Sequence, residues 1–551
     1  MRRIHMKKKT IVVVGGVAGG MSFANRYRRL NIDDEIIVFE KGPFVSFANC
    51  GLPYHISGEI KSRQSLLVVK EELLQKRFNL NVRSNSEVIS INPEQKKIQY
   101  RSNQEIFEQS YDELVISTGA KPIVPTIEGL DRIPFFTLRN IPDLDKIMLQ
   151  IKNHHPKHVS ILGAGFIGLE LAENLKMRGI EVALIEKSSD VLPVLDPEVS
   201  IHAKNALIQN GIDVYTNNEI VKIDPNTLYL KSGQEVKTDF LIISIGVAPD
   251  TTLLKNIGAN LGMKGGIIVD HNYQTSIPHI YAVGDAIIVK NQISNQDTLI
   301  PLASPANRQG RQLADILSGL NVYNKGSIGT SIVKVFDMSF ASTGLTEKQL
   351  TKGTYHVIHL LANDHASYYP GATSIHLKVI FDKMSHQILG AQAFGQKGVD
   401  KRIDIISTAI KAKLTITDLQ ELEFTYAPPY SSAKDIVNLA GYVGQNIILG
   451  ISQSVQWYDV EMLKNEGYLF IDVRSFIERE GFGYIEGSMH IDIDELYLRY
   501  QEIPKDKKLV VYCQSGTRSY NAERFLRAKG FEVYNLDGSY SVYDQISKEI
   551  K

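Results

Sequence analysis

Two cysteines occur in the 551 residues, and both stand where a thiol could react. Cys50 lies in the stretch SFANCGLPYH, a turn marked by Asn49, Gly51 and Pro53, and no second cysteine is close to it in the sequence. Such a thiol cannot form an internal disulfide, so it can cycle only through a mixed disulfide, a persulfide or a sulfenic acid. A buried core cysteine is the alternative, and the turn residues argue against it.

The other thiol, Cys513, follows the apolar run Leu509–Tyr512 and opens the sequence CQSGTRS. We expect a strand, a tight loop and a helix here, with loop N–H groups and the helix N-terminus surrounding the sulfur. Their field should lower the pKa of the Cys513 thiol and hold a persulfide or an oxyanion. Arg518 ends the loop.

The elements that must position Cys50 form a series of strand, glycine turn, helix, strand and acidic residue, and the series occurs twice. The first copy comprises strand Thr10–Val14, the turn GGVAGG, helix Met21–Leu30, strand Glu35–Phe39 and Glu40. The second comprises strand His158–Leu162, the turn GAGFIG, a helix to about Arg178, strand Val182–Ile185 and Glu186. This is the βαβ nucleotide-binding unit, so two bound dinucleotides are predicted.

The second glycine turn is a complete GxGxxG, which allows a tight turn, close approach of a pyrophosphate and helix packing. Glu186 stands where a carboxylate bonds a ribose 2′-hydroxyl, which favours NADH over NADPH, although Lys187 weakens that preference. A purely structural glycine turn is the alternative. The predicted NAD(P)H-binding residues are Gly163, Gly165, Phe166, Ile167, Gly168, Glu186 and Gly246.

The first glycine turn is imperfect, because Val17 replaces the middle glycine. Glu40, the pair Gly284-Asp285 and the turn Thr118-Gly119-Ala120 nevertheless support it. Together these motifs resemble the two-dinucleotide flavoprotein disulfide reductases, in which FAD occupies the first unit and NAD(P)H the second. The resemblance implies that FAD is bound by Gly15, Ala18, Gly19, Gly20, Glu40, Lys41, Thr118, Gly119, Ala120, Gly284, Asp285, Leu302 and Ala303.

SFANCGLPY and the loop GGVAGG are similar to the single-cysteine branch of that superfamily. The branch contains coenzyme A (CoA) disulfide reductases, CoA persulfide/polysulfide reductases, and NADH oxidases and peroxidases. The peroxidase pattern has a histidine at the place of Ala18, so this sequence favours sulfur substrates. The resemblance implies that Ser46 and Asn49 line the pantetheine entry. Arg26 and Arg29 are candidates for the CoA phosphates, or else belong to a solvated helix face.

Residues from about 330 to 450 alternate strands with a helix near Lys401–Ala412 and resemble the dimerisation domain of these enzymes. The resemblance implies a homodimer whose active sites are completed across the interface by tyrosines. A phenol there can protonate a leaving CoA thiolate. Tyr368 and Tyr426 are the predicted catalytic residues. Tyr369 and Tyr430 are alternatives in the same motifs, and all four could instead be packing aromatics.

The Cys513 loop and the upstream sequence FIDVR resemble the rhodanese active site. Tyrosine-phosphatase loops are one residue longer between Cys and Arg, so the resemblance implies that Cys513 and Arg518 transfer sulfane sulfur. Ser539 departs from the rhodanese pattern, which has a glycine there. A rhodanese fold without activity is the alternative.

The composition is ordinary, with 43% apolar residues, 22% charged residues and zero net charge. It gives no reason to expect nucleic-acid or membrane partners, and two thiols without a disulfide framework predict a cytoplasmic protein. The 14 histidines form no ligand-spaced cluster with either cysteine, so no metal is predicted. Translation could start at Met1 or Met6.

We therefore expect an α/β fold with two Rossmann-like dinucleotide-binding domains, an α+β dimerisation domain and a C-terminal α/β rhodanese domain. The predicted boundaries are 6–118 with 247–325 for FAD, 119–246 for NAD(P)H, 326–447 for dimerisation and 455–551 for rhodanese, with Gln445–Gln456 as a linker.

The predicted function is NAD(P)H- and FAD-dependent reduction of CoA disulfide, CoA persulfide or polysulfide at Cys50. The sequence does not select among these substrates, or elemental sulfur, and a sulfur relay from Cys513 to Cys50 rests only on their fusion. Three alternatives remain: an NADH oxidase or peroxidase cycling Cys50 through sulfenic acid, an inert rhodanese domain used for docking, and a redox sensor.

Overall fold

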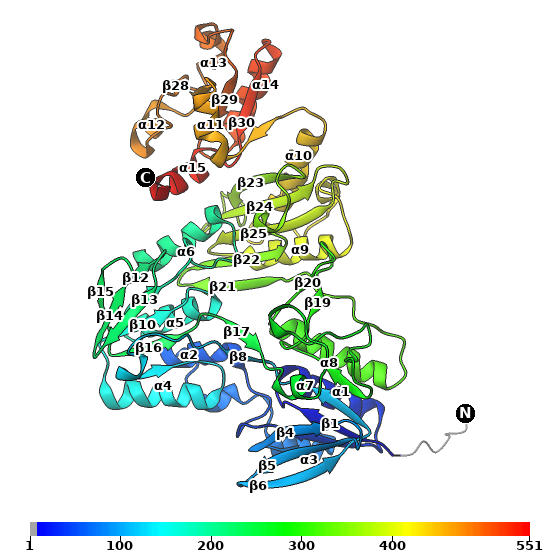
Figure 1. The fold of residues 1–551 in the computed structure, drawn as a ribbon. Coiled ribbons are helices and arrows are strands. Elements are labelled where there is room, and N and C mark those ends of the chain that lie inside the picture. The colour runs from blue at the N-terminus through cyan, green and yellow to red at the C-terminus, as the bar shows by residue number, and fades with distance from the viewer. Residues whose placement is uncertain (1–7, 551) are drawn as a thin grey trace. The chain divides into compact units, whose positions relative to one another are not determined.

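The computed structural model describes residues 8–550, so the possible start at Met6 lies outside the described residues. The chain forms two compact units (Figure 1). Unit 1 comprises the residues up to Ser189 together with Gly211–Ser327, and unit 2 comprises Asp190–Asn210 together with the residues from Ile328 onward. Within residues 8–550, no helix is long and apolar enough to cross a membrane.

The first sheet of unit 1 is parallel, with the order β18–β7–β1–β2–β3. These strands are Ile280–Ala282, Glu113–Ile116, Thr10–Val14, Glu35–Phe39 and Asn81–Arg83. β1 and β2 are almost wholly buried, β-branched runs, as expected of strands covered on both faces. Helix α1 (Ala18–Leu30) packs against α8 (Ala303–Leu317) (Figure 1). α1 begins at Ala18 and not at the predicted Met21, so its first turn includes the last three residues of GGVAGG.

The second sheet of unit 1 is also parallel, with the order β12–β11–β10–β16–β9. These strands are Ile212–Tyr215, Glu181–Ile185, His158–Leu162, Phe240–Ile243 and Phe135–Phe136. Helix α4 (Ile141–His154) precedes β10, and α5 (Phe166–Met177) follows its glycine turn. The two βαβ units predicted from the glycine turns are therefore both present.

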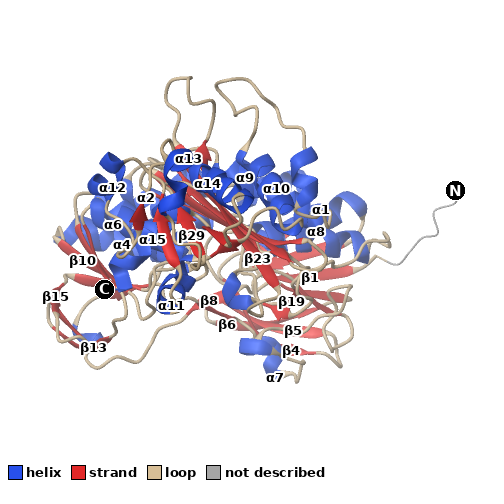
Figure 2. Cartoon of the chain, turned by 90° about the horizontal axis from the view of Figure 1, so that it is seen from above, coloured by secondary structure: helices blue, strands red, loops and turns tan. Residues whose placement is uncertain are grey.

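Unit 1 also holds smaller elements that the sequence analysis did not predict. Two antiparallel three-stranded sheets are β4–β5–β6 (Ser86–Asn92, Lys97–Ser102, Glu105–Ser110) and β13–β14–β15 (Ile220–Asp224, Thr227–Leu230, Glu235–Lys237). β4 contacts α7 (Thr252–Asn256), and Figure 2 shows this sheet beside that helix. Two-stranded ribbons join β8 (Ala120–Pro122) to β17 (Val247–Pro249) and β19 (Val289–Lys290) to β20 (Asp297–Thr298). The Cys50 turn contains a 3₁₀ turn, η1 (Asn49–Gly51), and α2 (Leu52–Ser57), and α3 (Glu71–Phe78) precedes β3.

Unit 2 contains an antiparallel sheet with the order β21–β22–β25–β24–β23. Its strands are Ser331–Val335, Met338–Gly344, Ile388–Gly395, Ser374–Asp382 and Tyr355–Asn363. Helix α9 (Val399–Lys411) packs on β22 and β25, and α10 (Ile436–Ile448) packs on β23. Helix α6 (Pro197–Gln209) contacts β21, β22 and β25, although its sequence lies between strands of unit 1.

The C-terminal part of unit 2 is a parallel sheet with the order β26–β30–β29–β27–β28. Its strands are Ser454–Val455, Val533–Leu536, Leu509–Tyr512, Leu469–Asp472 and Met489–His490. Helix α14 (Thr517–Ala528) packs on β29 and β30. The other helices are α11 (Val460–Asn465), α12 (Phe476–Phe482), α13 (Leu496–Arg499) and α15 (Ser539–Ile550).

The predicted linker Gln445–Gln456 is wrong at both ends. Helix α10 continues to Ile448 and stops before Gly450, whose φ of 66° suits the residue that follows a helix. β26 then pairs with β30 from Ser454 onward. The connection is therefore shorter than the sequence suggested.

Candidate active sites

A cavity of about 830 Å³ opens in unit 1 beside Cys50. Its walls include Cys50, Asn49 and most of the predicted FAD-binding residues: Gly15, Ala18, Gly19, Glu40, Lys41, Thr118, Gly119, Ala120, Gly284, Asp285 and Ala303. Two predicted residues, Gly20 and Leu302, are not among the wall residues. Gly20 instead allows α1 to approach its own turn, because a Cβ there would lie 2.0 Å from the Gly15 carbonyl oxygen. This concave, glycine-lined cavity fits a dinucleotide.

The two acidic residues at the strand ends bind their own glycine turns in the same way. Glu40 accepts hydrogen bonds of 2.9 Å from the N–H groups of Gly16 and Gly42. Glu186 accepts from Ala164 at 2.7 Å and Ser188 at 2.8 Å. A carboxylate has about four acceptor positions, so each retains capacity for a ribose hydroxyl. The repeated arrangement supports a second nucleotide position at Gly163, Gly165 and Gly168.

Arg139, which the sequence analysis missed, connects the Cys50 turn to the Gly-Asp motif. Its Nη2 donates to Asp285 Oδ2 at 2.7 Å, and its carbonyl oxygen accepts from the Asn49 side-chain amide at 3.0 Å. Both arginine and aspartate line the cavity. Because Arg139 and Asn49 are 90 positions apart in the sequence, no local pattern indicated this contact.

Cys50 lies in η1 on the cavity wall and is exposed to solvent. The surrounding protein desolvates the thiolate and Glu170 repels it, so the pKa of Cys50 is raised; Arg139 acts in the opposite direction. Without a further positive charge from a ligand, Cys50 therefore favours the protonated thiol.

Glu170 of α5 is the carboxyl that acts on Cys50 most strongly, and the sequence analysis missed it. Burial raises the pKa of Glu170 to about 7, while the Tyr54 hydroxyl, which donates to its Oε1 at 3.3 Å, partly opposes that shift. Its charge therefore changes with pH near neutrality. It can hold or release a proton beside the Cys50 turn.

The four predicted substrate residues have different surroundings. Asn49 lines the cavity, and Ser46 adopts φ 51°, in the left-handed region. The Arg26 guanidinium pairs with Asp315 at 2.6 Å, and the Arg29 guanidinium lies 5.5 Å from the centre of the Phe78 ring. Both arginines thus have partners within unit 1, and a CoA phosphate at Arg26 would have to compete with Asp315.

The two predicted catalytic tyrosines lie together in unit 2. The hydroxyls of Tyr368 and Tyr426 are 3.1 Å apart, and both side chains are exposed. The hydrogen bond to Tyr426 raises the pKa of Tyr368. Tyr369 and Tyr430 are also exposed, and the Tyr369 ring packs against His365. An exposed pair of bonded phenols is available to a partner surface, unlike aromatic residues of a core.

Cys513 lies at the end of β29, buried in the rhodanese-like part of unit 2. Burial alone would raise its pKa, but the Ser519 hydroxyl and the N–H groups of Ser519, Gly516 and Ser515 outweigh that effect and lower it, as the sequence predicted. The Gly516 N–H donates to Sγ at 3.1 Å. Ser539 joins the cradle: its Oγ accepts from the Cys513 N–H at 3.3 Å and lies 3.8 Å from Sγ.

Arg518 is paired with a carboxylate that the sequence analysis did not identify. Its Nη1 and Nη2 each donate to one oxygen of Glu478 at 2.6 Å. Arg518 holds the pKa of Glu478 down at about 2, assisted by Ser475. The sequence signal was a Ser-x-x-Glu capping box, Ser475 to Glu478, at the start of α12.

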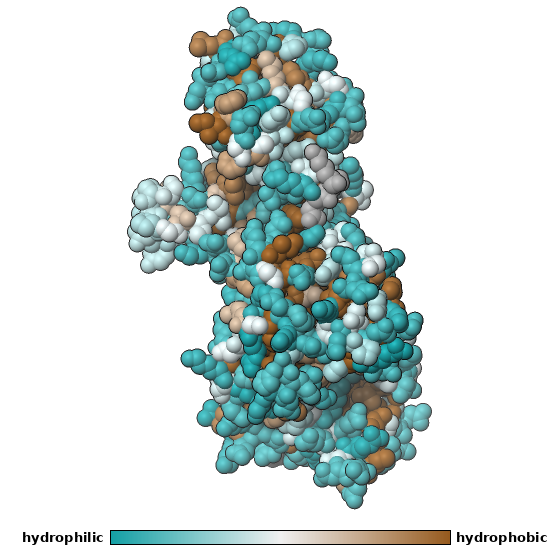
Figure 3. Space-filling model, turned by 90° about the vertical axis from the view of Figure 1, so that its left-hand side faces the viewer, coloured by the Kyte–Doolittle hydropathy of each residue, from teal (hydrophilic) through white to brown (hydrophobic). Residues whose placement is uncertain are grey.

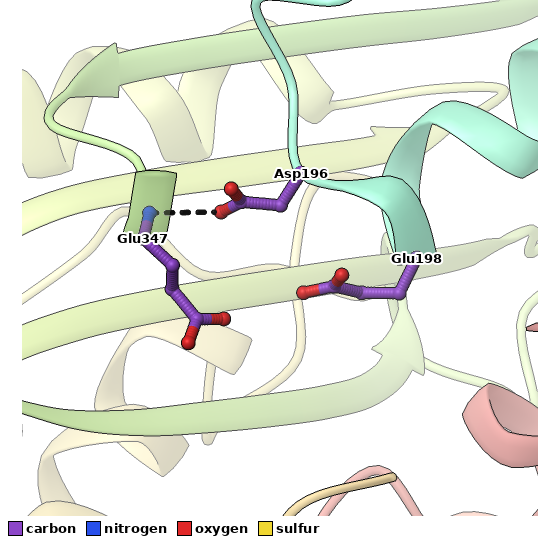
Figure 4. A group of neighbouring side chains, drawn as sticks. All are labelled: Asp196, Glu198 and Glu347. Carbon is purple, nitrogen blue, oxygen red and sulfur yellow. Dashed lines mark hydrogen bonds between the residues drawn. The ribbon is translucent and has the colours of Figure 1, made fainter. Parts of the chain in front are cut away.

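A buried cluster of charges lies elsewhere in unit 2. The carboxyl groups of Asp196, Glu198 and Glu347 turn toward one another (Figure 4), and one oxygen of each lies within 4.8 Å of the others. Three converging carboxylates can hold a metal ion, but here the Lys378 ammonium contacts all three, at 2.8 Å from Asp196, 2.5 Å from Glu347 and in direct contact with Glu198. The ammonium occupies the position that a cation would take.

His359 of β23 extends this cluster to the rhodanese-like sheet. Its Nδ1 lies 2.8 Å from Asp537 and its Nε2 3.3 Å from Glu198. Burial opposes protonation of His359, but the two carboxylates outweigh it and raise its pKa to about 9. His359 is therefore a buried imidazolium, and Asp537, two residues before Ser539, is fixed by it.

Family comparisons agree with this arrangement along the whole chain. Residues 9–310 match the pyridine nucleotide-disulphide oxidoreductase family, residues 330–436 match its dimerisation domain, and residues 455–545 match the rhodanese-like domain. The chain belongs to the pyridine nucleotide-disulphide oxidoreductase family, whose members are flavin-dependent enzymes. The predicted fold class is confirmed.

Individual relatives show which enzymes of this family the chain resembles. The chain is 39% identical over 442 residues to the coenzyme A disulfide reductase of Staphylococcus haemolyticus (strain JCSC1435), covering 80% of this chain and 100% of the relative. It superposes on reduced Bacillus anthracis CoADR-RHD with a TM-score of 0.97 and 47% identity, covering 99% of each chain. A NAD-dependent persulfide reductase from A. fulgidus gives a TM-score of 0.90 and 35% identity, with 97% and 100% covered. The predicted resemblance to CoA disulfide and persulfide reductases is therefore confirmed.

A more distant neighbour represents the oxidase alternative. The water-forming NADH oxidase from Lactobacillus brevis gives a TM-score of 0.76 and 27% identity, covering 80% of this chain and 99% of the oxidase. The oxidase branch thus shares the reductase fold but is less similar to this chain.

Proposed function

We propose that this protein uses NADH to reduce CoA disulfide, CoA persulfide or polysulfide at Cys50, and that Cys513 carries sulfane sulfur. One observation carries the proposal: a single thiol lies on the wall of a dinucleotide cavity, and the only other thiol of the chain lies in an anion-stabilising loop. The coenzyme A disulfide reductase and persulfide reductase among the similar proteins support the same chemistry.

FAD would be held by the cavity residues around Gly15, Glu40 and Asp285, and when bound it supplies a two-electron carrier between NADH and Cys50. NADH would bind at the second glycine turn, where Glu186 favours a ribose hydroxyl over a phosphate. The Cys50 thiolate attacks the S–S bond of the substrate, and the CoA thiolate leaves with the bond's electron pair. We assign the protonation of that thiolate to the Tyr368–Tyr426 pair of the other subunit of a homodimer.

In this proposal, Cys513 accepts sulfane sulfur from a donor and passes it to a CoA-like carrier, which delivers it to Cys50. Covalent fusion of two sulfur-handling sites supports this relay. Both cysteines lie at positions where the free thiol reacts, and free thiols persist in a reducing compartment such as the cytoplasm. If a Cys513→Ser variant reduced every polysulfide donor at the wild-type rate, the relay would be dispensable.

The test is anaerobic NADH oxidation by the FAD-loaded protein with CoA disulfide and, separately, CoA persulfide. Both activities should fall by more than about 10³-fold in Cys50→Ser, because no other thiol lines the described cavity. Faster turnover of the persulfide would identify a persulfide reductase, and faster turnover of the disulfide a thiol-redox enzyme. If NADH were consumed only after oxygen was admitted, the NADH oxidase would replace this proposal.

Ala18 favours the sulfur chemistry over the oxidase, because it removes the histidine expected in the peroxidase pattern. The docking alternative, in which the rhodanese-like domain is inert, predicts that Cys513 never acquires sulfur. Mass spectrometry of the Cys513 peptide after exposure to a persulfide donor distinguishes this inert domain from an active sulfur carrier.

A further inference from the structure

The anion-binding face of the Cys513 loop is occupied by a carboxylate of the chain itself. Glu478 engages both terminal nitrogens of Arg518 at 2.6 Å, the bidentate geometry that an arginine offers to an anionic ligand. The same carboxylate accepts from Ser475 Oγ at 3.0 Å and from the Ser475 N–H at 3.2 Å, so its position is fixed from two sides. An anionic donor at Arg518 would have to displace Glu478.

The second arginine of the loop region is also committed to a carboxylate. Arg474 is fully buried, binds Asp472 through Nε at 2.9 Å and Nη2 at 2.6 Å, and donates to Gln514 at 3.0 Å. Asp492 adds a further negative charge near Arg518. A third arginine, Arg479, lies 3.7 Å from Asp472. Three arginines thus stand against three carboxylates, and beside a Cys513 thiolate they leave no excess of positive charge with which to hold a dianion.

The two residues before Glu478 on α12, Phe476 and Ile477, are apolar and exposed. Phe476 is 64% and Ile477 is 82% exposed, and the Phe476 ring packs near His490. Figure 3 shows such apolar side chains as isolated brown groups among mostly hydrophilic surface. A surface of this kind favours the carbon chain of an organic donor over a small inorganic anion.

We propose that Glu478 makes the Cys513 loop selective for thiol-derived persulfides and excludes thiosulfate. A persulfide R–S–SH carries at most one negative charge on its two sulfurs, whereas thiosulfate is a dianion. The Cys513 thiolate attacks the outer sulfur, the donor S–S bond breaks, and its electron pair leaves with RS⁻, giving Cys513–S–SH. Glu478 is a specificity-determining residue in this step and takes no part in the bond changes.

The proposal rests on the proposed function of Cys513 as a sulfur carrier and adds the class of donor. Its test measures single-turnover loading of Cys513 in the full-length, FAD-loaded protein. The two donors are thiosulfate and 2-hydroxyethyl persulfide, whose carbon chain carries no charge, and the gain of one sulfur on the Cys513 peptide is followed by mass spectrometry. 2-Hydroxyethyl persulfide should load the wild type at least about tenfold faster than thiosulfate, because the Glu478 carboxylate repels a dianion more strongly than a monoanion.

Glu478→Gln removes the charge but keeps an acceptor for Arg518, so loading by thiosulfate should rise about tenfold while loading by the persulfide changes less than about twofold. Glu478→Asp keeps the charge and should still exclude thiosulfate, which separates charge from side-chain geometry. Glu480→Gln makes the same charge change at an exposed position two residues farther along α12 and should behave as the wild type. Because the pKa of Glu478 is about 2, the exclusion should persist from pH 5 to pH 8.

The experiment distinguishes failure of the donor selectivity from failure of the sulfur-carrier role. Equal loading of the wild type by both donors, or an unchanged donor ratio in Glu478→Gln, would overturn the selectivity and leave the sulfur-carrier role intact. Loading by neither donor would overturn the sulfur-carrier role itself. If Glu478→Gln did not fold, Glu478→Asp would still test whether the charge at position 478 excludes thiosulfate. Loading of Cys513 by thiosulfate should then be as slow in Glu478→Asp as in the wild type. Faster loading with the charge retained would contradict the proposal.

Discussion

The two thiols of this chain are tuned in opposite directions by their surroundings. Cys50 has a raised pKa because protein desolvates it and Glu170 repels its thiolate, whereas Cys513 has a lowered pKa because hydroxyl and N–H donors outweigh its burial. A thiol with a raised pKa needs activation from a bound ligand, and one with a lowered pKa is a ready nucleophile. The surroundings thus disfavour ionisation of Cys50 and favour ionisation of Cys513.

Glu170→Gln should lower the pKa of Cys50, because it removes the carboxylate that repels the thiolate. The pKa of Glu170 is about 7, so its charge is present over the alkaline range in which Cys50 ionises. The pH at which iodoacetamide alkylation reaches half its plateau rate should therefore move to lower values. The measurement is made in Cys513→Ser protein, which leaves one thiol in the chain.

Glu235→Gln, an exposed change in β15 of the same unit, serves as the control and should leave the alkylation profile unchanged. An identical profile for Glu170→Gln and its parent would mean that Glu170 does not act on Cys50.

The glycine turns show how far an element can be predicted from sequence. Strands Thr10–Val14, Glu35–Phe39 and His158–Leu162 have the predicted bounds, because each is a short, mainly apolar run that ends at a glycine turn or at an acidic residue. The polar, half-exposed strands β4–β6 were missed because they lack such runs. The contacts of Arg139, Glu170 and Glu478 were missed for a different reason: each joins segments far apart in sequence, and spacing carries no information about such pairs.

Two glycines of the second turn should respond differently to alanine. A Cβ at Gly168 would lie 2.0 Å from the Gly163 carbonyl oxygen, whereas a Cβ at Gly165 would have no neighbour within 4 Å. Gly168→Ala should cost about 1–3 kcal/mol of stability through overpacking. Gly165→Ala should leave stability nearly unchanged and weaken NADH binding, because its Cβ would project into the proposed pyrophosphate position.

Thermal unfolding and NADH titration of the two variants distinguish these effects. Equal loss of stability in both would refute the packing argument, and undiminished NADH binding by Gly165→Ala would place the nucleotide elsewhere.

Unit 2 brings together buried charges from three parts of the chain. Helix α6 supplies Glu198, with Asp196 at its N-terminal cap; the dimerisation sheet supplies Lys378 and His359; and the rhodanese-like domain supplies Asp537. Removing one partner of such a group leaves an uncompensated buried charge, at a cost of about 3–5 kcal/mol. Sequence reasoning could not find this cluster, because its members are up to about 340 positions apart and follow no periodic pattern.

Unit 2 should lose stability as the pH rises through about 9. His359 binds a proton more tightly in the folded protein, with a pKa of about 9, than in the unfolded chain, so its contribution is complete below about pH 6.5 and lost above 9. The groups facing it are Asp537, Glu198 and the ring of His376, whose pKa is lowered by burial. The loss should be on the order of 1–3 kcal/mol.

Urea unfolding followed by tryptophan fluorescence measures this change. Trp457 is the one tryptophan of the chain, and it packs with Ile201 of α6 and with Val542 and Ile546 of α15. Its fluorescence therefore reports on the contact between α6 and the rhodanese-like domain. His359→Gln should be less stable at pH 7 and should lack the decline between pH 7 and 9.5. A parallel decline in the wild type and in His359→Gln would assign the effect to another group.

The contact between His359 and Asp537 links the dimerisation domain to the rhodanese-like domain, so loss of the latter domain would change the former. The Staphylococcus haemolyticus relative is matched over its whole length by 80% of this chain, so it has no counterpart for the remaining fifth. Cutting this chain at Gly450 would remove Asp537 and leave His359 without its nearer carboxylate. Loss of the domain would therefore lower the pKa of His359 and favour its neutral form. The rhodanese-like domain on its own would in turn lack the imidazolium that binds Asp537.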